Sequence, residues 1–264
     1  MNLNVVTYNL KFPDPNSAPW DGVRRPLVRR QLTALAPDVV ATQEGHYHQI
    51  RHLAEDLGSQ WQYLGTGRDG GSTGEWCGIL FDGARFEPVA FDHFWLSDTP
   101  EAVGSRTPSW GNHGNCRMAT WARLRDRATA AEVLVLDTHL DESSERARVW
   151  GAELIAARLN RPGLPEAVVV CGDFNAPAPT SDAYRALTAR AGLRDAWLEA
   201  NSAEPKTGTF TGWDEPVPGG DRIDWILHRG PLTARRAVLG EIRGEDGQWP
   251  SDHLPVSVAL EWDA

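Results

Sequence analysis

Residues 168–175 read Val-Val-Val-Cys-Gly-Asp-Phe-Asn, a β-branched apolar run that changes abruptly to glycine and short polar side chains. A continuous apolar run of this length, bounded by a turn signal, is typical of a strand buried on both faces of its sheet. Because proline has no backbone N–H to donate, Pro177 and Pro179 are expected to end the strand. The segment therefore predicts a central strand that presents Asp173 and Asn175 at its end.

Asp173 and Asn175 have two interpretations. A carboxylate can take a proton from a water molecule while an amide holds that molecule in position, so the pair suits hydrolysis. The alternative is an ordinary strand exit, because aspartate and asparagine also favour turns by bonding to the nearby backbone. The rest of the chain favours the first interpretation.

The 264 residues show no point at which the chain would divide. Glycine and proline are dispersed, and neither a Ser/Gly-rich linker nor a run of like charges separates two halves. A chain of this length can bury the core of one large α/β domain. The sequence therefore predicts one domain over residues 1–264.

The composition limits the classes of partner and of site. A formal net charge of −10 and a pI of about 5.3 give no basic surface for tight, nonspecific nucleic-acid binding. A divalent cation can still bridge an acidic site to a phosphate group. Three cysteines at unrelated spacings do not form a disulfide framework and are expected to be small buried side chains: Cys77, Cys116 and Cys171.

The sequence contains neither an N-terminal signal pattern nor an apolar run of membrane-spanning length. We therefore expect a soluble, cytoplasmic protein without stable membrane insertion. No feature of the sequence indicates a protein partner.

Polar side chains recur on the other predicted strands, mostly at their ends. Carboxylate, amide and imidazole groups can bind a metal ion or carry a proton, so the recurrence predicts a polar site built where strands end. The strands and their side chains are residues 3–9 with Asn9, 38–44 with Glu44, 133–139 with His139, and 222–228, which carry Asp224 inside the strand.

Helical spacing of apolar residues predicts helices over residues 23–35, in a stretch that ends at Leu57, over 142–159 and over 183–191. Strands outnumber these helices, and many are joined by short hairpin-like loops. The pattern favours two mostly antiparallel sheets covered by helices over a doubly wound parallel sheet. In the first helix, four arginines are expected on a solvated face: Arg24, Arg25, Arg29 and Arg30.

Six short motifs follow one another along the chain. They are Thr-Tyr-Asn at 7–9, Gln-Glu at 43–44, Thr-His-Leu-Asp at 138–141, Gly-Asp-Phe-Asn at 172–175, Arg-Ile-Asp-Trp-Ile at 222–226 and Ser-Asp-His-Leu-Pro at 251–255. In this order they resemble the endonuclease/exonuclease/phosphatase superfamily, in a bacterial, deoxyribonuclease I-like form. The resemblance implies a four-layer α/β sandwich, in which two mostly antiparallel central β-sheets are flanked by helices. It also implies hydrolysis of a phosphate ester.

The resemblance implies that Glu44 is the main ligand of a hard cation and that Asn9 completes the ligand set or holds Glu44. Asp252 would complete the same set or form a second, weaker site. Oxygen donors without a cysteine cluster favour Mg²⁺ or Mn²⁺ over zinc. The alternative is that these side chains only cap turns.

Five catalytic residues are implied in the same way. Asp173 would activate the attacking water, and Asn175 would position the water or a phosphate oxygen. His253 would stabilise the charge that develops on the phosphate, with Asp224 orienting its imidazole. His139 would assist the leaving oxygen.

Two further residues are implied to bind substrate. Arg117 resembles a family arginine that clamps a phosphate. Glu75, in a Gly-Glu-Trp segment, resembles the acid that pairs with the histidine at position 139. The alternative is that both are exposed, one on an alternating strand and the other in a glycine-rich loop.

The sequence thus predicts a metal-dependent phosphohydrolase, with a phosphodiesterase or nuclease favoured and a nucleic acid or nucleotide as its phosphate-ester substrate. One alternative is a phosphomonoesterase that acts on a small phosphorylated metabolite or a lipid headgroup. The other is a non-catalytic binding module of the same fold, which we reject because each main motif position holds its expected residue type. The sequence does not identify the substrate.

Overall fold

Two six-stranded sheets form the centre of the structure, a computed structural model that describes residues 2–263. In spatial order, the first sheet contains β11 (Leu232–Leu239), β12 (Val256–Trp262), β1 (Asn2–Asn9), β2 (Val39–Gln43), β4 (Gly78–Asp82) and β3 (Trp61–Leu64). The second contains β5 (Phe86–Trp95), β6 (Met118–Asp126), β7 (Glu132–His139), β8 (Ala167–Ala178), β10 (Arg222–Arg229) and β9 (Arg194–Asp195).

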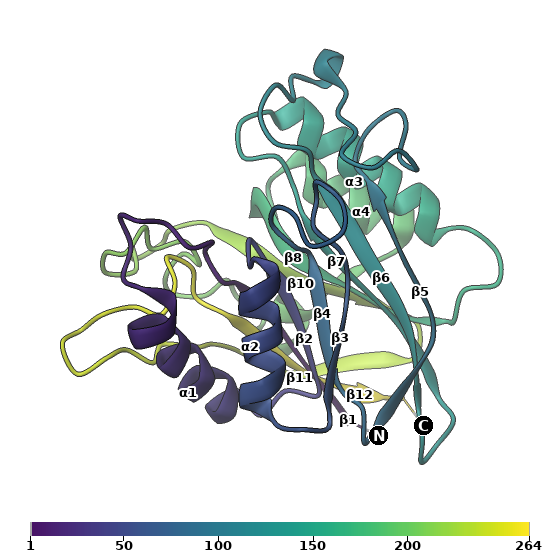
Figure 1. The fold of residues 1–264 in the computed structure, drawn as a ribbon. Helices are drawn as coiled ribbons and strands as arrows, with labels where there is room; N and C mark the ends of the chain where they lie inside the picture. Colours follow the sequence, from purple (N-terminus) through teal and green to yellow (C-terminus); the bar gives the residue numbers. More distant parts are fainter. Residues whose placement is uncertain (1, 264) are drawn as a thin grey trace.

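Helices form the outer layers (Figure 1). On the first sheet lie α1 (Arg25–Leu35), which a π-helical turn precedes at Trp20–Arg24, and α2 (Tyr47–Leu57). On the second lie α3 (Glu145–Leu159) and α4 (Asp182–Ala191). A short α5 (Ala196–Asn201) contacts β10 and β11. The four-layer sandwich expected from the motifs is confirmed, and none of the helices within residues 2–263 is long and apolar enough to cross a membrane.

The strand pairs are mostly antiparallel, as expected, but two parallel pairs position the polar strand ends. In β1 and β2, Asn9 is level with Gln43, so Glu44 follows directly beside Asn9. In β7 and β8, His139 is level with Asp173. Because parallel strands point the same way, each pair delivers two consecutive motifs to one end of its sheet.

Strand β8 is longer than the sequence indicated, since it continues through Pro177 to Ala178. The register of β8 against β10 is interrupted between Arg222 and Asp224, so Pro177 lies in an irregular part of the pairing. Asn175, with φ +48°, lies in the same part. The expectation was therefore wrong for Pro177, because the bulge removes the need for a donor there, whereas the strand does end directly before Pro179.

Gly172 is required by the close approach of β7. Its φ is +151°, and a Cβ built on it would lie 1.9 Å from the carbonyl oxygen of Thr138. Any larger residue would push β8 away from β7, and Asp173 is the next residue along.

Arg24 is buried, so the expectation of a fully solvated arginine face was wrong for this residue. Its guanidinium donates to the carbonyl oxygens of Leu10 and Lys11 at 3.0 and 2.7 Å, and it lies between the rings of Trp20 and Trp213. The local helical pattern could not reveal this role, because the acceptors belong to a loop that packs against the helix only in the folded chain.

The interface between the sheets is mainly apolar, but one buried polar pair spans it. Gln43 of β2 donates from Nε2 to Oδ1 of Asp137 in β7 at 2.6 Å. Asp137 is fully buried, and its Oδ2 bonds to no group among residues 2–263. Burial raises the pKa of Asp137 well above its ordinary value of 3.8, so burial favours the protonated form of this carboxyl.

A protonated buried carboxyl makes stability depend on pH. Since its pKa is higher in the folded than in the unfolded chain, Asp137 contributes stability below its unfolded pKa, and this contribution decreases as pH rises. Asp137→Asn is permanently neutral, so its free energy of unfolding should rise relative to wild type between pH 5 and pH 8 in urea titrations.

Asp137→Leu is the matched comparison. It is also permanently neutral but removes the acceptor of Gln43, so it should be about 2 kcal/mol less stable than Asp137→Asn at both pH values. A constant difference between wild type and Asp137→Asn across this pH range would contradict a protonated Asp137.

Candidate active site

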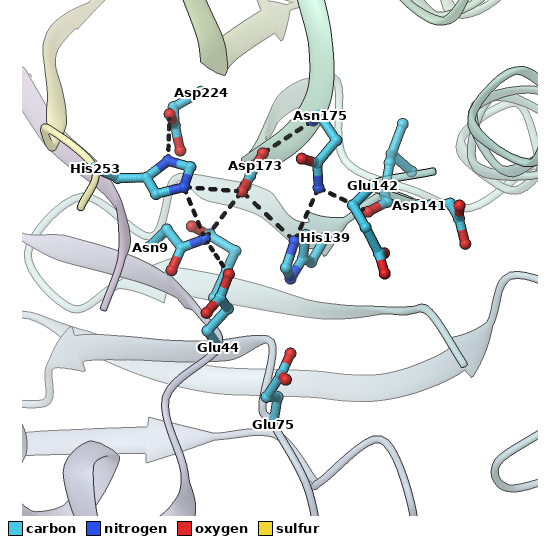
Figure 2. Close-up of polar contacts among 12 residues, drawn as sticks. Asn9, Glu44, Glu75, His139, Asp141, Glu142, Asp173, Asn175, Asp224 and His253 are labelled. Atoms are coloured by element: carbon cyan, nitrogen blue, oxygen red, sulfur yellow. Dashed lines mark hydrogen bonds and ion pairs between the residues drawn. The ribbon is translucent and has the colours of Figure 1, made fainter. Parts of the chain in front are cut away.

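The side-chain amide of Asn9 is the centre of a buried polar cluster at the junction of the two sheets (Figure 2). Its Nδ2 donates to Oε1 of Glu44 and to Oδ2 of Asp173, both at 2.9 Å, and lies 3.4 Å from Nε2 of His253. Its Oδ1 accepts the backbone N–H of Lys11 at 3.0 Å, which fixes the orientation of the amide. Asn9 thus holds two carboxylates, one from each sheet, in one place.

Glu44 is prepared to bind a cation. It follows β2 with φ +61°, and Asn9 holds its Oε1. Its Oε2 is buried and accepts no hydrogen bond from any residue that the structure describes. Ligand atoms of Glu44, Asp173 and His253 lie within 4.8 Å of one another, which is close enough to surround one metal ion. The chain therefore offers a metal site whose strongest feature is the unpaired Oε2 atom.

His253 lies in the turn before β12, and Asp224 of β10 holds its ring. Nδ1 of His253 is 3.0 Å from Oδ2 of Asp224, while Nε2 is 3.6 Å from Oδ2 of Asp173. Burial alone would lower the pKa of His253, but Asp224 and Asp173 outweigh it and raise the pKa to about 10. At neutral pH the ring is therefore a cation that presents an Nε2–H to the site.

Asp173 is buried beneath this imidazole. Burial raises its pKa to about 7, against the opposing effect of the His253 charge. Oδ1 of Asp173 accepts the backbone N–H of Asn175 at 2.9 Å, so the bulge in β8 fixes the carboxyl. A carboxyl group that titrates near neutral pH can accept a proton from water and release it again.

His139 has the opposite surroundings. Burial, and then the charge of Arg117, lower its pKa well below 6.5, so the ring is neutral. Nη1 of Arg117 lies 2.8 Å from Nδ1, and Nδ2 of Asn175 lies 3.0 Å from Nε2. A neutral imidazole can accept only one of these bonds, and because Arg117 can only donate, Nδ1 is the acceptor and Nε2 carries the ring proton.

Glu75 was expected to pair with His139, but the two side chains form no hydrogen bond or ion pair with each other in the described structure. Glu75 bonds to Arg68 at 2.6 Å, and its Oε2 lies 4.0 Å from Arg117. Arg117 occupies Nδ1 of His139 and also pairs with Glu142. Neither Glu75 nor Arg117 is exposed, in contrast to the alternative interpretation of their positions. The similarity of the Gly-Glu-Trp segment could not show that an arginine lies between the two side chains.

Asp252 is buried beside the cluster. Within residues 2–263, it does not belong to the group whose ligand atoms are close enough to share one metal ion, which consists of Glu44, Asp173 and His253. Its Oδ2 pairs with Nζ of Lys11 at 3.2 Å. Lys11 was missed from the sequence, although it stands two residues after Asn9. Asp141 points away from the cluster and caps the backbone of Ser143 and Ser144 (Figure 2).

A cavity of about 350 Å³ opens above these residues. Its walls include Phe12 and Phe210, which the sequence analysis did not select. The Phe210 ring is 49 % exposed and lies 5.0 Å from the His253 ring, measured between centroids. The ten selected residues meet in this region, and eight of them line the cavity: Glu44, Glu75, Arg117, His139, Asp173, Asn175, Asp252 and His253. Asn9 and Asp224 support them from beneath.

A four-layer sandwich with acids, amides and histidines at the junction of its sheets is the arrangement of phosphoester hydrolases of the deoxyribonuclease I-like fold. The sequence model of the Endonuclease/Exonuclease/phosphatase family matches residues 6–253. The chain therefore belongs to the endonuclease/exonuclease/phosphatase family, which confirms the resemblance.

Solved structures of similar proteins cover the whole fold. A family member from Bacteroides thetaiotaomicron is 27 % identical, with a TM-score of 0.89 over 100 % of this chain and 99 % of the other. A mannosyl-6-phosphatase from the same species is 26 % identical, with a TM-score of 0.87 over 98 % and 100 %. TDP2 from D. rerio, complexed with single-strand DNA product, shares the fold at 16 % identity and a TM-score of 0.73 over 98 % and 99 %. A comparison with curated proteins gave no match.

The arrangement predicts that Glu44 acts through a cation and that His253 and Asp224 act on the phosphate. Glu44→Gln should weaken both metal affinity and turnover, because it removes charge at Oε2. His253→Ala should lower turnover by roughly a hundredfold while metal affinity changes little, since it removes a preorganised donor. Asp224→Asn should act in the same way but less severely, because the imidazole remains.

Calorimetric metal titration and steady-state kinetics on the three variants measure these effects. Loss of metal binding in His253→Ala as complete as in Glu44→Gln would contradict this division of roles, as would wild-type turnover of His253→Ala.

Proposed function

We propose that this protein hydrolyses a phosphate ester with the help of Mg²⁺ or Mn²⁺. The observation that carries the proposal is the buried Oε2 of Glu44, which has no hydrogen-bond donor in residues 2–263, in a carboxylate that lies close to Asp173 and His253. Because the raised pKa of His253 keeps its Nε2 protonated, carboxylate oxygens are the main donors to the ion. Such donors suit hard cations. The bound ion would act as a Lewis acid that polarises a phosphoryl oxygen.

The chain's own residues supply the remaining steps. Asp173 takes a proton from the attacking water, because its raised pKa places it near neutral pH and Asn9 and Asn175 hold it in place. The protonated Nε2 of His253 donates to the phosphate, where negative charge increases as the water attacks.

On the opposite side of the cavity, the neutral ring of His139 contributes hydrogen bonding to the leaving oxygen. Its lowered pKa keeps this ring neutral, so the proton comes from elsewhere: as the P–O bond breaks, Asp173 returns to the leaving oxygen the proton that it took from the water.

The wall of the cavity favours a small substrate with one phosphate. The wall carries Glu142, whose carboxylate accepts hydrogen bonds and repels further phosphates, and Glu75, whose pKa burial raises to about 7. The single guanidinium there, Arg117, is already paired with Glu142. A sugar-like alcohol fits these groups better than a polyanion does. The mannosyl-6-phosphatase at 26 % identity supports the same class.

The phosphodiesterase or nuclease predicted from the sequence is the second candidate. The ring of Phe210 supports this candidate. It is exposed, lies next to His253 and lines the cavity, and an aromatic face can stack a nucleobase. The absence of a basic stripe in a chain of net charge −10 argues against strong binding to duplex nucleic acid.

One activity panel distinguishes the candidates. The metal-loaded enzyme is tested on hexose 6-phosphates, bis-p-nitrophenyl phosphate, single-stranded and duplex DNA, and RNA, with His253→Ala as the inactive control. Excess chelator should abolish hydrolysis, Mg²⁺ or Mn²⁺ should restore it, and kcat/KM should be highest for a sugar monoester.

Full activity in chelator, or restoration by zinc alone, would contradict the metal prediction. Higher kcat/KM on DNA or RNA than on every monoester would select the nuclease instead.

The nucleophile in this proposal is water and not the thiol of Cys171, two residues before Asp173. Cys171 is fully buried in the core, and burial raises the pKa of its thiol well above 9.0. Cys171→Ala should keep most of the turnover and lose about 1 kcal/mol of stability. Steady-state kinetics of Cys171→Ala and Asp173→Asn, measured in parallel, check this. A loss of turnover in Cys171→Ala as large as that in Asp173→Asn would identify the thiol as the nucleophile.

A further inference from the structure

The ammonium of Lys11 stands between two of the carboxylates expected to bind metal. Its Nζ lies 3.2 Å from Oδ2 of Asp252 and 3.8 Å from Oε2 of Glu44. The Lys11 side chain is 20 % exposed and lines the cavity. A fixed positive charge therefore already occupies the Asp252 side of the site.

The backbone holds Lys11 in this position from three directions. Its φ of +54° is unusual for a residue with a side chain. Its N–H donates to Oδ1 of Asn9 at 3.0 Å, while its carbonyl oxygen accepts from Arg24 at 2.7 Å and from Gln49 at 3.0 Å. A strained conformation persists only where surrounding contacts determine it, and such residues cluster at functional sites.

The choice of lysine is also unusual for this chain. Of its 26 lysine and arginine residues, only Lys11 and Lys206 are lysines. Arginine presents a wide planar fork, whereas an ammonium is a compact point charge that can fit where a small cation would. At this position the chain therefore has a lysine, whose compact charge can fit where a small cation would.

The charges around Lys11 explain why a second ion is disfavoured. A divalent ion bound by Asp252 would lie within a few ångströms of the ammonium and be strongly repelled. With Lys11 present, the charge of Asp252 is already balanced. Oε2 of Glu44 accepts no hydrogen bond from residues 2–263, and it lies farther from the ammonium, at 3.8 Å, than Oδ2 of Asp252 does, at 3.2 Å.

We propose that Lys11 takes the place of a second divalent cation, so that the protein binds one ion at Glu44 and excludes another at Asp252. The inference rests on the proposed function, because it requires an ion at Glu44. Lys11 acts here as a positioning residue, since it keeps Asp252 paired and confines the ion to the side of the site that Asp173 and His253 face.

Mn²⁺ binding tests this inference without any substrate. Isothermal titration and the electron paramagnetic resonance signal of free Mn²⁺ give the number of ions bound per chain. Wild type should bind one. Lys11→Met keeps the aliphatic stem but removes the charge, and it should bind two, the second more weakly. The double variant Lys11→Met with Asp252→Asn should bind one again, because the second ion needs the Asp252 carboxylate.

Two matched variants serve as controls. Lys206→Met removes the exposed lysine and should leave one ion bound. Lys11→Arg keeps the charge and should also bind one. Thermal unfolding of each variant establishes that it is folded before titration.

The outcomes distinguish this inference from the proposed function. One ion in Lys11→Met, at any affinity, overturns the role of Lys11 and leaves the metal-dependent function standing. Two ions in wild type overturn it as well. No ion in wild type overturns both proposals.

Discussion

The hydrogen bonds of the Asn9 side-chain amide join the two halves of the site. Its two N–H groups reach Glu44 from the first sheet and Asp173 from the second, each at 2.9 Å, while its oxygen accepts the Lys11 backbone. Two buried carboxylates this close would repel each other without a shared donor between them. Because the donor is a fully buried side chain at a strand end, the distance between the carboxyl groups of Glu44 and Asp173 depends on how the sheets pack.

The same packing gives two histidines opposite charges around one carboxyl. His253 and His139 lie 3.6 and 3.5 Å from Oδ2 of Asp173. The first ring is backed by Asp224, so its pKa rises to about 10, whereas the second is buried against Arg117 and stays neutral. One residue type thus supplies a cation on one side of the proposed phosphate position and a neutral group on the other. In each histidine, the group next to Nδ1 decides whether the ring is charged or neutral: Asp224 for His253 and Arg117 for His139.

Irregular features of the scaffold are concentrated beneath the site. A bulge in β8 fixes Asn175, and Gly172 allows β7 to approach closely enough to place His139 beside Asp173. On the other sheet, buried Arg24 holds the loop that carries Lys11. Each of these features costs stability locally, through strain or burial of charge, and each is stabilised by hydrogen bonds from elsewhere in the chain.

The motifs and apolar patterns of the sequence were enough to predict the family and the layered fold. Sequence patterns predicted the five strands that carry the site, β1, β2, β7, β8 and β10. The strands β9 and β11 and the helix α5 were not predicted, because short or mixed segments carry little periodicity. The ten selected residues do meet at one junction, since strand ends of both sheets converge there. Only the tertiary structure decided which groups pair: Arg117 and not Glu75 with His139, Lys11 with Asp252, and Arg24 with a loop carbonyl. The reason is physical, because Asn9 and Asp173 are 164 residues apart and no local pattern fixes a distance that packing sets.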